Sequence, residues 1–211
     1  MSLDIKENTE VKDKILEAAT SLFWQYGTRS VTMDEIAKEI AVSKKTIYQY
    51  FKDKNEIVCR VMERKHDKQM KEMRELESNA DNAIEALLNV SDFMAETFAK
   101  VNPSLLFDTK KYHPEAWELH QNRRDQIIES IKGNLRRGIQ DGLYREDLPL
   151  EYLAVLRIEQ VELAFDGQKF SSDQYELVKV QLAFLDHFIR GLVTLKGFQL
   201  LETYKNRKHH D

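Results

Sequence analysis

The sequence predicts an all-α protein of about nine helices, with an N-terminal three-helix unit followed by a larger helical domain. The chain has 7 glycines and 3 prolines among its 211 residues. Together these two residue types are less than half as frequent as in average proteins. Charged residues make up 32% of the chain and hydrophobic residues 42%. Apolar side chains recur every three or four positions along most of the chain, which is the period of a helix with one buried face. These observations disfavour a turn-rich β fold.

The first three predicted helices lie at residues 11–26, 33–40 and 44–51. The first carries one apolar stripe at helical spacing, made up of Ile15, Ala18, Ala19, Leu22, Phe23 and Tyr26. Before the second, Thr32 and Glu35 have the spacing of a capping box, in which each side chain binds the backbone N–H of the other. Ser43 can cap the third helix. A turn of three residues, 41–43, therefore joins the second and third helices.

Two short helices joined by such a turn form a helix-turn-helix pattern, in which the second helix enters the major groove of DNA. The pattern needs an inner face that anchors this helix, which Ile47 and Phe51 provide, and an outer face of hydrogen-bond donors. The outward positions are Lys44, Lys45, Thr46, Tyr48 and Gln49. Residues 43–54 hold four lysines and one aspartate, a local charge of +3 that would attract phosphates.

The net charge of the whole chain, −4, would by itself argue against a nucleic-acid partner. The distribution of charged residues along the chain removes this objection to a nucleic-acid partner. Residues 1–77 hold 15 basic and 15 acidic side chains, whereas residues 78–211 hold 17 and 21. The acidic excess therefore lies entirely in the C-terminal part, and the segment expected to face the groove is locally basic.

The remaining helices predicted by the apolar period lie at residues 54–76, 81–101, 105–107, 114–141, 150–165 and 172–195, with a last short helix at 198–204. Gly133 and Gly138 fall inside one of them and suggest close approach of another backbone or a local break. We place the domain boundary after residue 54. Residues 1–54 would then form a DNA-binding domain, and residues 55–211 a ligand-binding and dimerisation domain.

Several other classes of protein are disfavoured. Cys59 is the single cysteine, so no intramolecular disulfide can form, and a cytoplasmic location is the simple interpretation. No stretch approaches the roughly 20 apolar residues of a membrane span, and the N-terminus lacks the apolar segment of a signal peptide. The histidines show no metal-ligand spacing, and the common phosphate-binding, zinc-protease and serine-hydrolase motifs are absent. We expect no metal, no cofactor, no membrane association and no enzymatic activity.

The helix-turn-helix lies within a longer recognisable segment, Ile15–Val61, that contains ILEAATSLFWQYG and TRSVTMDEIAKEIAVSKKTIYQYFKDKNEI. This segment resembles the N-terminal domain of TetR-family transcriptional regulators, and TIYQYFKDK is its most specific part. The resemblance implies a homodimer with an all-helical C-terminal domain that binds an effector. It also implies binding to double-stranded DNA at a near-palindromic operator, and repression that an unidentified small molecule relieves.

The resemblance also implies roles for individual residues. The residues expected to contact DNA are Thr28, Ser30, Thr32, Lys44, Lys45, Thr46, Tyr48, Gln49, Tyr50 and Lys54. Tyr48 would pack over the groove against phosphate and sugar, and Lys54 would hold a backbone phosphate. Many family members have a small residue or proline where Lys45 stands, so two adjacent lysines favour phosphate contact over base readout here.

Arg157 is a charged residue on an otherwise apolar helix face, and an unpaired buried guanidinium is costly. Two interpretations stay open: an ion pair with Glu or Asp from the neighbouring helix, or contact with an anionic effector. The residues that could line an effector cavity are Met94, Phe98, Phe107, Trp117, His120 and Arg157. Ordinary core packing would explain the aromatic residues equally well.

The helices at 150–165 and 172–195 carry more apolar surface than one bundle needs. We expect them to pair with their two-fold copies in a four-helix interface, as in the family. The residues expected at this contact are Val161, Leu182, Leu185, Phe188, Ile189 and Leu192. The dimer would place two copies of helix 44–51 about one turn of DNA, or a little more, apart. In the family mechanism the effector tilts the helix at 54–76 and changes this separation, so effector and DNA oppose each other.

Two alternative functions stay open. A DNA-binding structural or cell-division factor of the same fold would lack an enclosed cavity between the helices at 81–101 and 150–165. An α-helical enzyme or partner-binding module would keep the same affinity for promoter DNA after Tyr48→Ala and Lys54→Ala.

Overall fold

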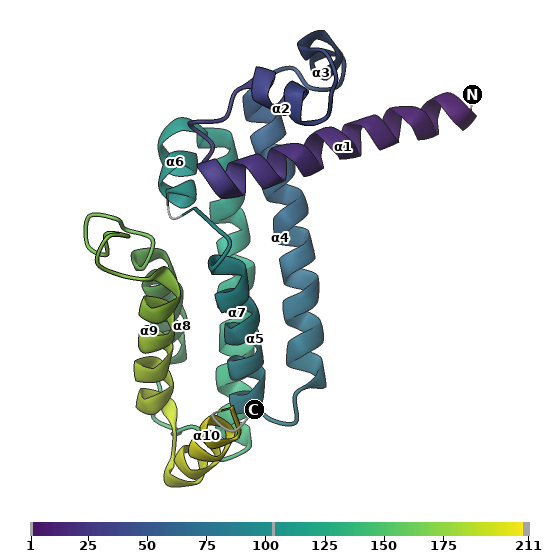
Figure 1. Ribbon diagram of the computed structural model, residues 1–211. Helices are drawn as coiled ribbons and strands as arrows, with labels where there is room; N and C mark the ends of the chain where they lie inside the picture. The colour runs from purple at the N-terminus through teal and green to yellow at the C-terminus, as the bar shows by residue number, and fades with distance from the viewer. Residues whose placement is uncertain (1, 103, 209–211) are drawn as a thin grey trace. The chain divides into compact units, whose positions relative to one another are not determined.

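The computed structural model describes residues 2–102 and 104–208, and within them the chain is helical, without a strand (Figure 1). The helices are α1 (Ser2–Tyr26), α2 (Met33–Glu39), α3 (Lys44–Tyr50), α4 (Lys54–Asn79), α5 (Ala83–Phe98), α6 (Leu105–Tyr112), α7 (Pro114–Gln140), α8 (Leu150–Leu163), α9 (Leu177–Leu192) and α10 (Leu195–Lys208). The predicted all-α class is confirmed.

The helices lie where the apolar period predicted them, and the differences are at their ends. The main changes are that α1 starts earlier, α6 reaches Tyr112, α9 starts at Leu177 rather than residue 172, and α10 extends the predicted 198–204. The start of α9 is delayed because residues 171–175 form a turn. In this turn the N–H groups of Gln174 and Tyr175 both donate to the carbonyl oxygen of Ser171.

The chain forms two compact units, each with its own core. The first unit contains residues 1–68 and 100–122, and the second contains residues 69–99 and 123–211. The division falls inside α4 and inside α7. The first unit therefore extends well beyond the boundary after residue 54 that the sequence indicated.

The core of the first unit joins α1, α2, α3 and the start of α4. Ile15, Phe23, Ile36, Ile47 and Phe51 are buried there, each with at most 1% of its surface exposed. Figure 1 shows α2 and α3 as short helices that follow one another along the chain. Because Ile47 and Phe51 point inward, α3 is held by its inner side while its other residues remain at the surface.

The turn between α2 and α3 contains Ala41 in the left-handed region, with φ 54°. Two hydrogen bonds close the end of α2: Val42 N donates to Ala37 O at 3.0 Å, and Ala41 N donates to Lys38 O at 3.2 Å. This is the pattern of a Schellman motif, a position where glycine is usual. The motif explains how α2 stops after two turns and the chain reverses within three residues.

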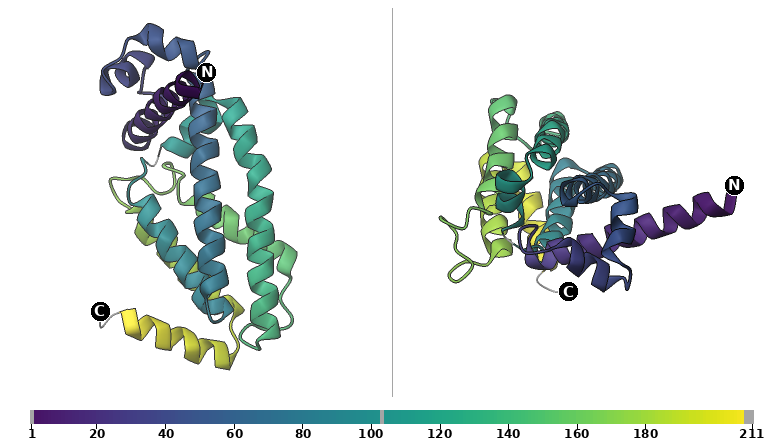
Figure 2. Two further views of the ribbon diagram at one scale, coloured as in Figure 1. Left: turned by 90° about the vertical axis from the view of Figure 1, so that its right-hand side faces the viewer. Right: turned by 90° about the horizontal axis from the view of Figure 1, so that it is seen from above.

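The core of the second unit is formed by side chains from α5, α7, α9 and α10. Ile84, Leu135, Ile189, Leu192 and Leu201 are buried there. In the views of Figure 2, α10 crosses one end of this unit beside the start of α5. Asn82, which caps α5, also donates from Nδ2 to the Tyr204 hydroxyl at 2.9 Å and so ties the two helices together.

Only one of the two glycines noted inside α7 is in close contact with another residue. A Cβ at Gly138 would overlap the ring of Tyr144, which is fully buried directly after the helix. The close approach is therefore by a side chain rather than by another backbone, and α7 has no break at this residue. Gly133 has no atom within 4 Å of the position that a Cβ would take.

The two glycines give opposite expectations for stability. Gly133→Ala should raise the free energy of unfolding by about 1 kcal/mol, because alanine favours a helix interior over glycine. Gly138→Ala should lower it by roughly 1–3 kcal/mol, because the new methyl displaces Tyr144 in a packed core. Urea denaturation of both variants beside the unmodified protein measures the difference. Equal effects of the two substitutions would contradict this account.

Candidate nucleic-acid interface and apolar cavity

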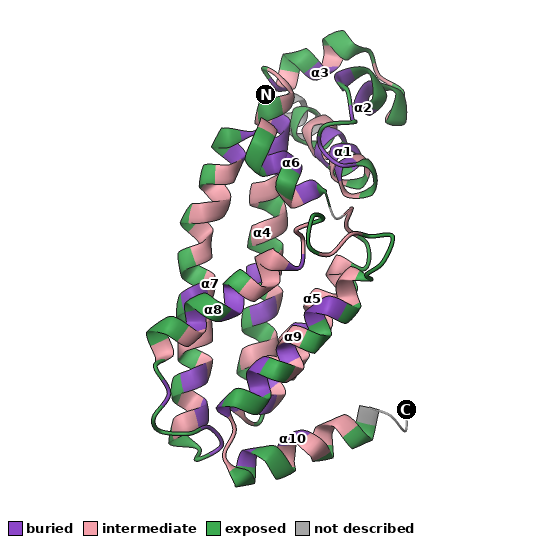
Figure 3. Cartoon of the chain, turned by 90° about the vertical axis from the view of Figure 1, so that its left-hand side faces the viewer, coloured by how far each residue is buried: buried purple, intermediate pink, exposed green. Residues whose placement is uncertain are grey.

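The outer face of α3 presents polar side chains at the surface. Lys44, Lys45, Tyr48 and Gln49 are all exposed, and 48% of Tyr48 is open to solvent. Ile47 is the buried residue within this helix. Figure 3 shows α3 largely in the colour of exposed residues. An aromatic ring beside lysine and amide donors is suited to contact with phosphates, sugars and base edges.

The two lysines at the start of α3 differ in their partners. Lys44 Nζ donates to Asp34 Oδ2 of α2 at 2.7 Å, and this hydrogen bond raises the pKa of Lys44. Lys45 forms no ion pair with a described residue. The positive charge of Lys44 is thus partly balanced within the protein, whereas that of Lys45 is available to a phosphate.

Thr32 is the N-cap of α2, and Thr46 is bonded to Ser43, the N-cap of α3. Thr32 and Glu35 form the predicted capping box, with Thr32 N donating to Glu35 Oε2 at 2.6 Å and Glu35 N to Thr32 Oγ1 at 3.2 Å. The hydrogen bonds from Thr32 hold the pKa of Glu35 below its usual range. Thr46 Oγ1 is hydrogen-bonded to Ser43 Oγ at 2.8 Å, at the start of α3. These hydroxyl groups are exposed or half-buried, but they already have partners.

Lys54 lies at the start of α4 as expected, but its ammonium group is bound within the protein. Its ammonium group donates to the carbonyl oxygens of Thr28, at 2.9 Å, and Val31, at 2.8 Å. Burial lowers the pKa of Lys54. Lys54 therefore braces the loop before α2 against the start of α4, and both bonds would compete with a phosphate.

Thr28 also differs from the expectation, whereas Ser30 is exposed as a phosphate contact requires. Thr28 is fully buried, so its side chain cannot reach a phosphate. Tyr50 is half-buried against the core of the first unit. The sequence analysis did not include Arg29, which is exposed between Thr28 and Ser30. Its guanidinium carbon lies 5.4 Å from the centroid of the Tyr112 ring.

The second unit contains an apolar cavity of about 130 Å³. Side chains from α5, α7, α8 and α9 line it, together with Met73 of α4. Met94, Phe98 and Arg157, three of the six residues expected at an effector cavity, are among them. Phe107, Trp117 and His120 are not; they belong to the first unit, where Phe107 is exposed and Trp117 stacks on His120.

Arg157 is the charged residue of this cavity. Only 9% of its surface is exposed, and its Nη1 has no hydrogen-bond partner among the described residues. Its guanidinium carbon lies 5.9 Å from the centroid of the Phe188 ring. Burial lowers the pKa of Arg157 to about 10, so the group stays charged at neutral pH. One interpretation of Arg157 was an ion pair with Glu or Asp of the neighbouring helix. Within residues 2–102 and 104–208 it does not form one.

The cavity contains two further polar residues that sequence reasoning missed, Ser91 and Gln181. Ser91 Oγ donates to Leu87 O at 2.7 Å, one turn back in α5. Gln181 is 4% exposed and donates from Nε2 to Val161 O at 2.8 Å, while its Oε1 has no partner among the described residues. The sequence did contain a signal for this residue, because Gln181 is a polar side chain within the apolar stripe of α9.

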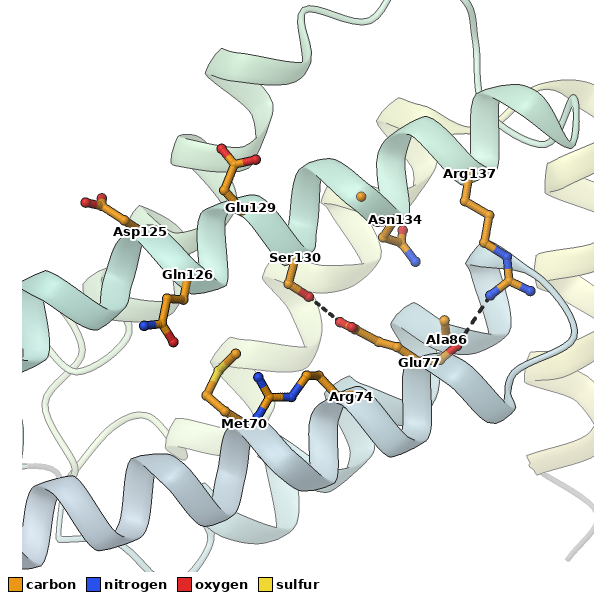
Figure 4. Close-up of a pocket in the computed structure, with 11 residues that line it drawn as sticks. Met70, Arg74, Glu77, Ala86, Asp125, Gln126, Glu129, Ser130, Asn134 and Arg137 are labelled. Carbon is orange, nitrogen blue, oxygen red and sulfur yellow. Dashed lines mark hydrogen bonds between the residues drawn. The ribbon is translucent and has the colours of Figure 1, made fainter.

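A second, more open groove of about 710 Å³ lies between the end of α4 and α7 (Figure 4). Ser130 donates a hydrogen bond to the Glu77 carboxylate across it. Arg137 donates to the carbonyl oxygens of Ala80, at 2.7 Å, and Glu77, at 3.3 Å. These bonds satisfy the polar groups that close the end of α4, so we assign them a structural role.

Most of the residues expected at a dimer contact are instead inside the second unit. Leu185, Phe188, Ile189 and Leu192 are at most 5% exposed, because they fill the core of this unit. Val161 is half-buried and lines the cavity with Leu182, which is exposed. The apolar residues at the surface of α8 are Tyr152, Val155 and Leu156, and Tyr152 is 78% exposed. Figure 3 shows exposed residues along both α8 and α9.

Two other types of site are absent from the part of the chain that the structure describes. No helix there is both long enough and apolar enough to cross a lipid bilayer. No cluster of three or more histidine, cysteine, aspartate or glutamate side chains there has the arrangement of a metal site.

Comparison with known proteins places these features in a family. Residues 15–61 match the family described as bacterial regulatory proteins, tetR family. An uncharacterised HTH-type transcriptional regulator, YhgD of Bacillus subtilis, is 30% identical over 166 residues, which are 75% of this chain and 84% of that protein. The chain belongs to the TetR family. This TetR-family protein is therefore a DNA-binding transcriptional regulator, and the expectation that it is not an enzyme is confirmed.

Solved structures share the fold of this TetR-family regulator. A TetR-family transcriptional regulator from Agrobacterium tumefaciens superposes with a TM-score of 0.75 at 18% identity, over 89% of this chain and all of that one. FadR of Bacillus subtilis, solved with stearoyl-CoA, gives a TM-score of 0.66 at 21% identity, over 84% of this chain and 97% of that one. At these identities the likeness establishes the fold.

The different partners of Lys44 and Lys45 lead to a testable difference in DNA binding. Lys45→Met should reduce the slope of log K against log[salt] for duplex DNA by about 0.9 per subunit, the value of one lost phosphate contact. Lys44→Met should have a smaller effect, because Asp34 already balances its charge. Fluorescence anisotropy over a salt series measures both slopes.

Lys14, exposed on α1, provides the matched control for removal of one positive charge. Lys14→Met should leave the slope unchanged. A Lys45→Met slope equal to that of the unmodified protein would show that α3 does not meet phosphates through this residue.

Proposed function

We propose that the protein is a homodimeric, cytoplasmic repressor that binds a near-palindromic operator and is released from it by a small-molecule effector. This proposal rests on two features that occur together. One is a helix-turn-helix with an exposed face of basic and aromatic residues, and the other is a separate apolar cavity that contains a buried charge. The first feature provides DNA contact, and the second provides a site for a ligand.

The DNA contact is assigned to α3 and the loop before α2. Lys45, Tyr48 and Gln49 of α3 are exposed together with Ser30 and Arg29 of the loop. Lys44 is placed at the edge of this surface, because Asp34 holds its ammonium group. Thr32 and Lys54 act as supports that fix the helix starts. With few free phosphate contacts in each subunit, tight binding requires both half-sites.

The dimer contact is assigned to exposed residues of α8 and α9. Tyr152, Val155 and Leu156 follow one another at i, i+3 and i+4 on α8, so they form one face of the helix. Leu182 is exposed on α9. Apolar side chains in a contiguous group at the surface of a monomer indicate a contact with another chain. An isologous pairing of this face with its two-fold copy closes a dimer.

The cavity supports release by an effector over a purely structural role. A TetR-like structural or cell-division factor without a ligand would have no need of a cavity between α5 and α8, whereas residues of both helices line one here. Met73, which also lines the cavity, lies on α4, and α4 begins at Lys54. We assign to this helix the coupling of the two sites, so that each ligand lowers the affinity for the other.

The operator and its recognition can be tested together by selecting bound duplexes from random DNA. Two inverted half-sites whose centres lie about one helical turn apart are the expected result. Tyr48→Ala should weaken binding to the selected duplex at least about fivefold, since a buried aromatic contact at an interface contributes more than about 1 kcal/mol. Tyr26→Ala, which removes a tyrosine of similar exposure from α1, should not. Equal affinities for the two variants would reject α3 as the reading helix.

The dimer face can be tested by placing a charge on it. Leu156→Glu should shift the protein from dimer to monomer in sedimentation velocity and abolish tight operator binding, because two carboxylates would meet in an apolar contact. Leu195→Glu provides the matched control, since Leu195 is 75% exposed on α10, away from the proposed face. If Leu156→Glu remained dimeric while Leu195→Glu dissociated, the interface would have to be moved to α10.

A further inference from the structure

The size of the cavity limits what it can hold. Its volume is about 130 Å³. An engineered protein cavity of about 150 Å³ lined by Leu, Ile and Phe binds benzene. The cavity of the second unit therefore fits an apolar group of about the size of one six-membered ring. Its walls match such a group, because side chains such as Leu87, Val90, Ile131 and Ile158 form most of the lining.

The polar residues of the cavity differ in whether they have partners. Ser91 is hydrogen-bonded within its own helix. Gln181 uses its Nε2 on Val161 O, which fixes the orientation of the amide and leaves Oε1 buried without a donor. Arg157 Nη1 is buried and meets no acceptor in the part of the chain that the structure describes. A buried polar group without a partner in a native protein requires an explanation, such as a bound ion or ligand.

The charge of Arg157 decides the chemistry of the ligand. The nearby Phe188 ring balances only part of the charge, because a cation–π contact contributes less than an ion pair with hydrogen bonds. The carboxylates of α8 itself are engaged elsewhere: Glu159 and Glu162 pair with Arg124, and Glu151 pairs with Lys132. A planar guanidinium fork is matched by a carboxylate, whereas a cationic ligand would be repelled.

We propose that this cavity binds a small apolar carboxylate, a molecule of about one ring with a single carboxylate group that pairs with Arg157. The proposal rests on the proposed function in that the carboxylate is the effector, but binding itself can be measured without DNA. The ring occupies the space between α5, α7 and α9, and the carboxylate accepts from Nη1. Gln181 Oε1 can accept one hydrogen bond from a hydroxyl or N–H group that such a ligand carries.

Calorimetric titration of the full-length protein with benzoate and with benzamide tests the proposal. The two probes have the same ring and differ in charge. Benzoate should bind at least about tenfold more tightly, as a charge-assisted hydrogen bond requires. In Arg157→Met, which keeps the length of the side chain, this preference should disappear. Arg136→Met, at an exposed position of α7, is the matched control and should keep it.

A thermal readout separates loss of binding from loss of folding. Without ligand, Arg157→Met should have a Tm equal to or above that of the unmodified protein, because it removes an unpaired buried charge. The increase in Tm that benzoate causes should be lost in this variant alone. No binding of benzoate, equal binding of benzamide, or unchanged binding of benzoate to Arg157→Met would each overturn the proposal.

Adding the operator duplex distinguishes this proposal from the proposed function. If benzoate binds through Arg157 and releases DNA, both stand. If it binds through Arg157 and leaves the DNA affinity unchanged, the ligand class stands and release by this ligand fails. If a neutral ligand releases DNA equally from the unmodified protein and Arg157→Met, the release mechanism stands and the carboxylate is rejected.

Discussion

The Lys54 ammonium group, held by the carbonyl oxygens of Thr28 and Val31, fixes the start of α4 against the loop that leads into α2. Removing a lysine from water is unfavourable unless its hydrogen bonds are replaced, and here two carbonyls replace them. The same contact satisfies backbone oxygens of a loop that is partly buried. The capping box of α2, the turn at Ala41 and the inward packing of Ile47 then follow along the chain. The exposed face of α3 is therefore positioned by residues that lie outside it.

Structural features that depend on residues close together in the sequence could be predicted. The capping box of Thr32 and Glu35, the cap at Ser43 and the inward position of Ile47 all depend on spacing along one or two helices, and the structure contains each of them. Roles that depend on distant segments could not be predicted in this way. Nothing near Thr28 in the sequence reveals that it is covered completely, or that Lys54 reaches back to its carbonyl oxygen.

The C-terminal part illustrates the same limit. Helical period correctly identified Leu185, Phe188 and Ile189 as members of one apolar face, but period does not say what covers that face. The core of the second unit covers it, and the exposed apolar residues are instead Tyr152, Val155 and Leu156 of α8 and Leu182 of α9. Arg157 was recognised as unusual from its apolar neighbours in the helix. Whether a carboxylate would meet it depends on α9 and α5, which only the three-dimensional structure brings together with it.

Ala41 has a consequence for the local stability of the first unit. An alanine in the left-handed region costs roughly 1–2 kcal/mol, which glycine would avoid. Opening of the turn between α2 and α3 removes this strain. The free energy needed to open the turn is therefore lower than it would be with an unstrained residue at position 41. Amide hydrogens of α3 should therefore exchange with solvent sooner than those in the buried middle of α1. In this view, the turn that precedes the recognition helix holds backbone strain within the first unit.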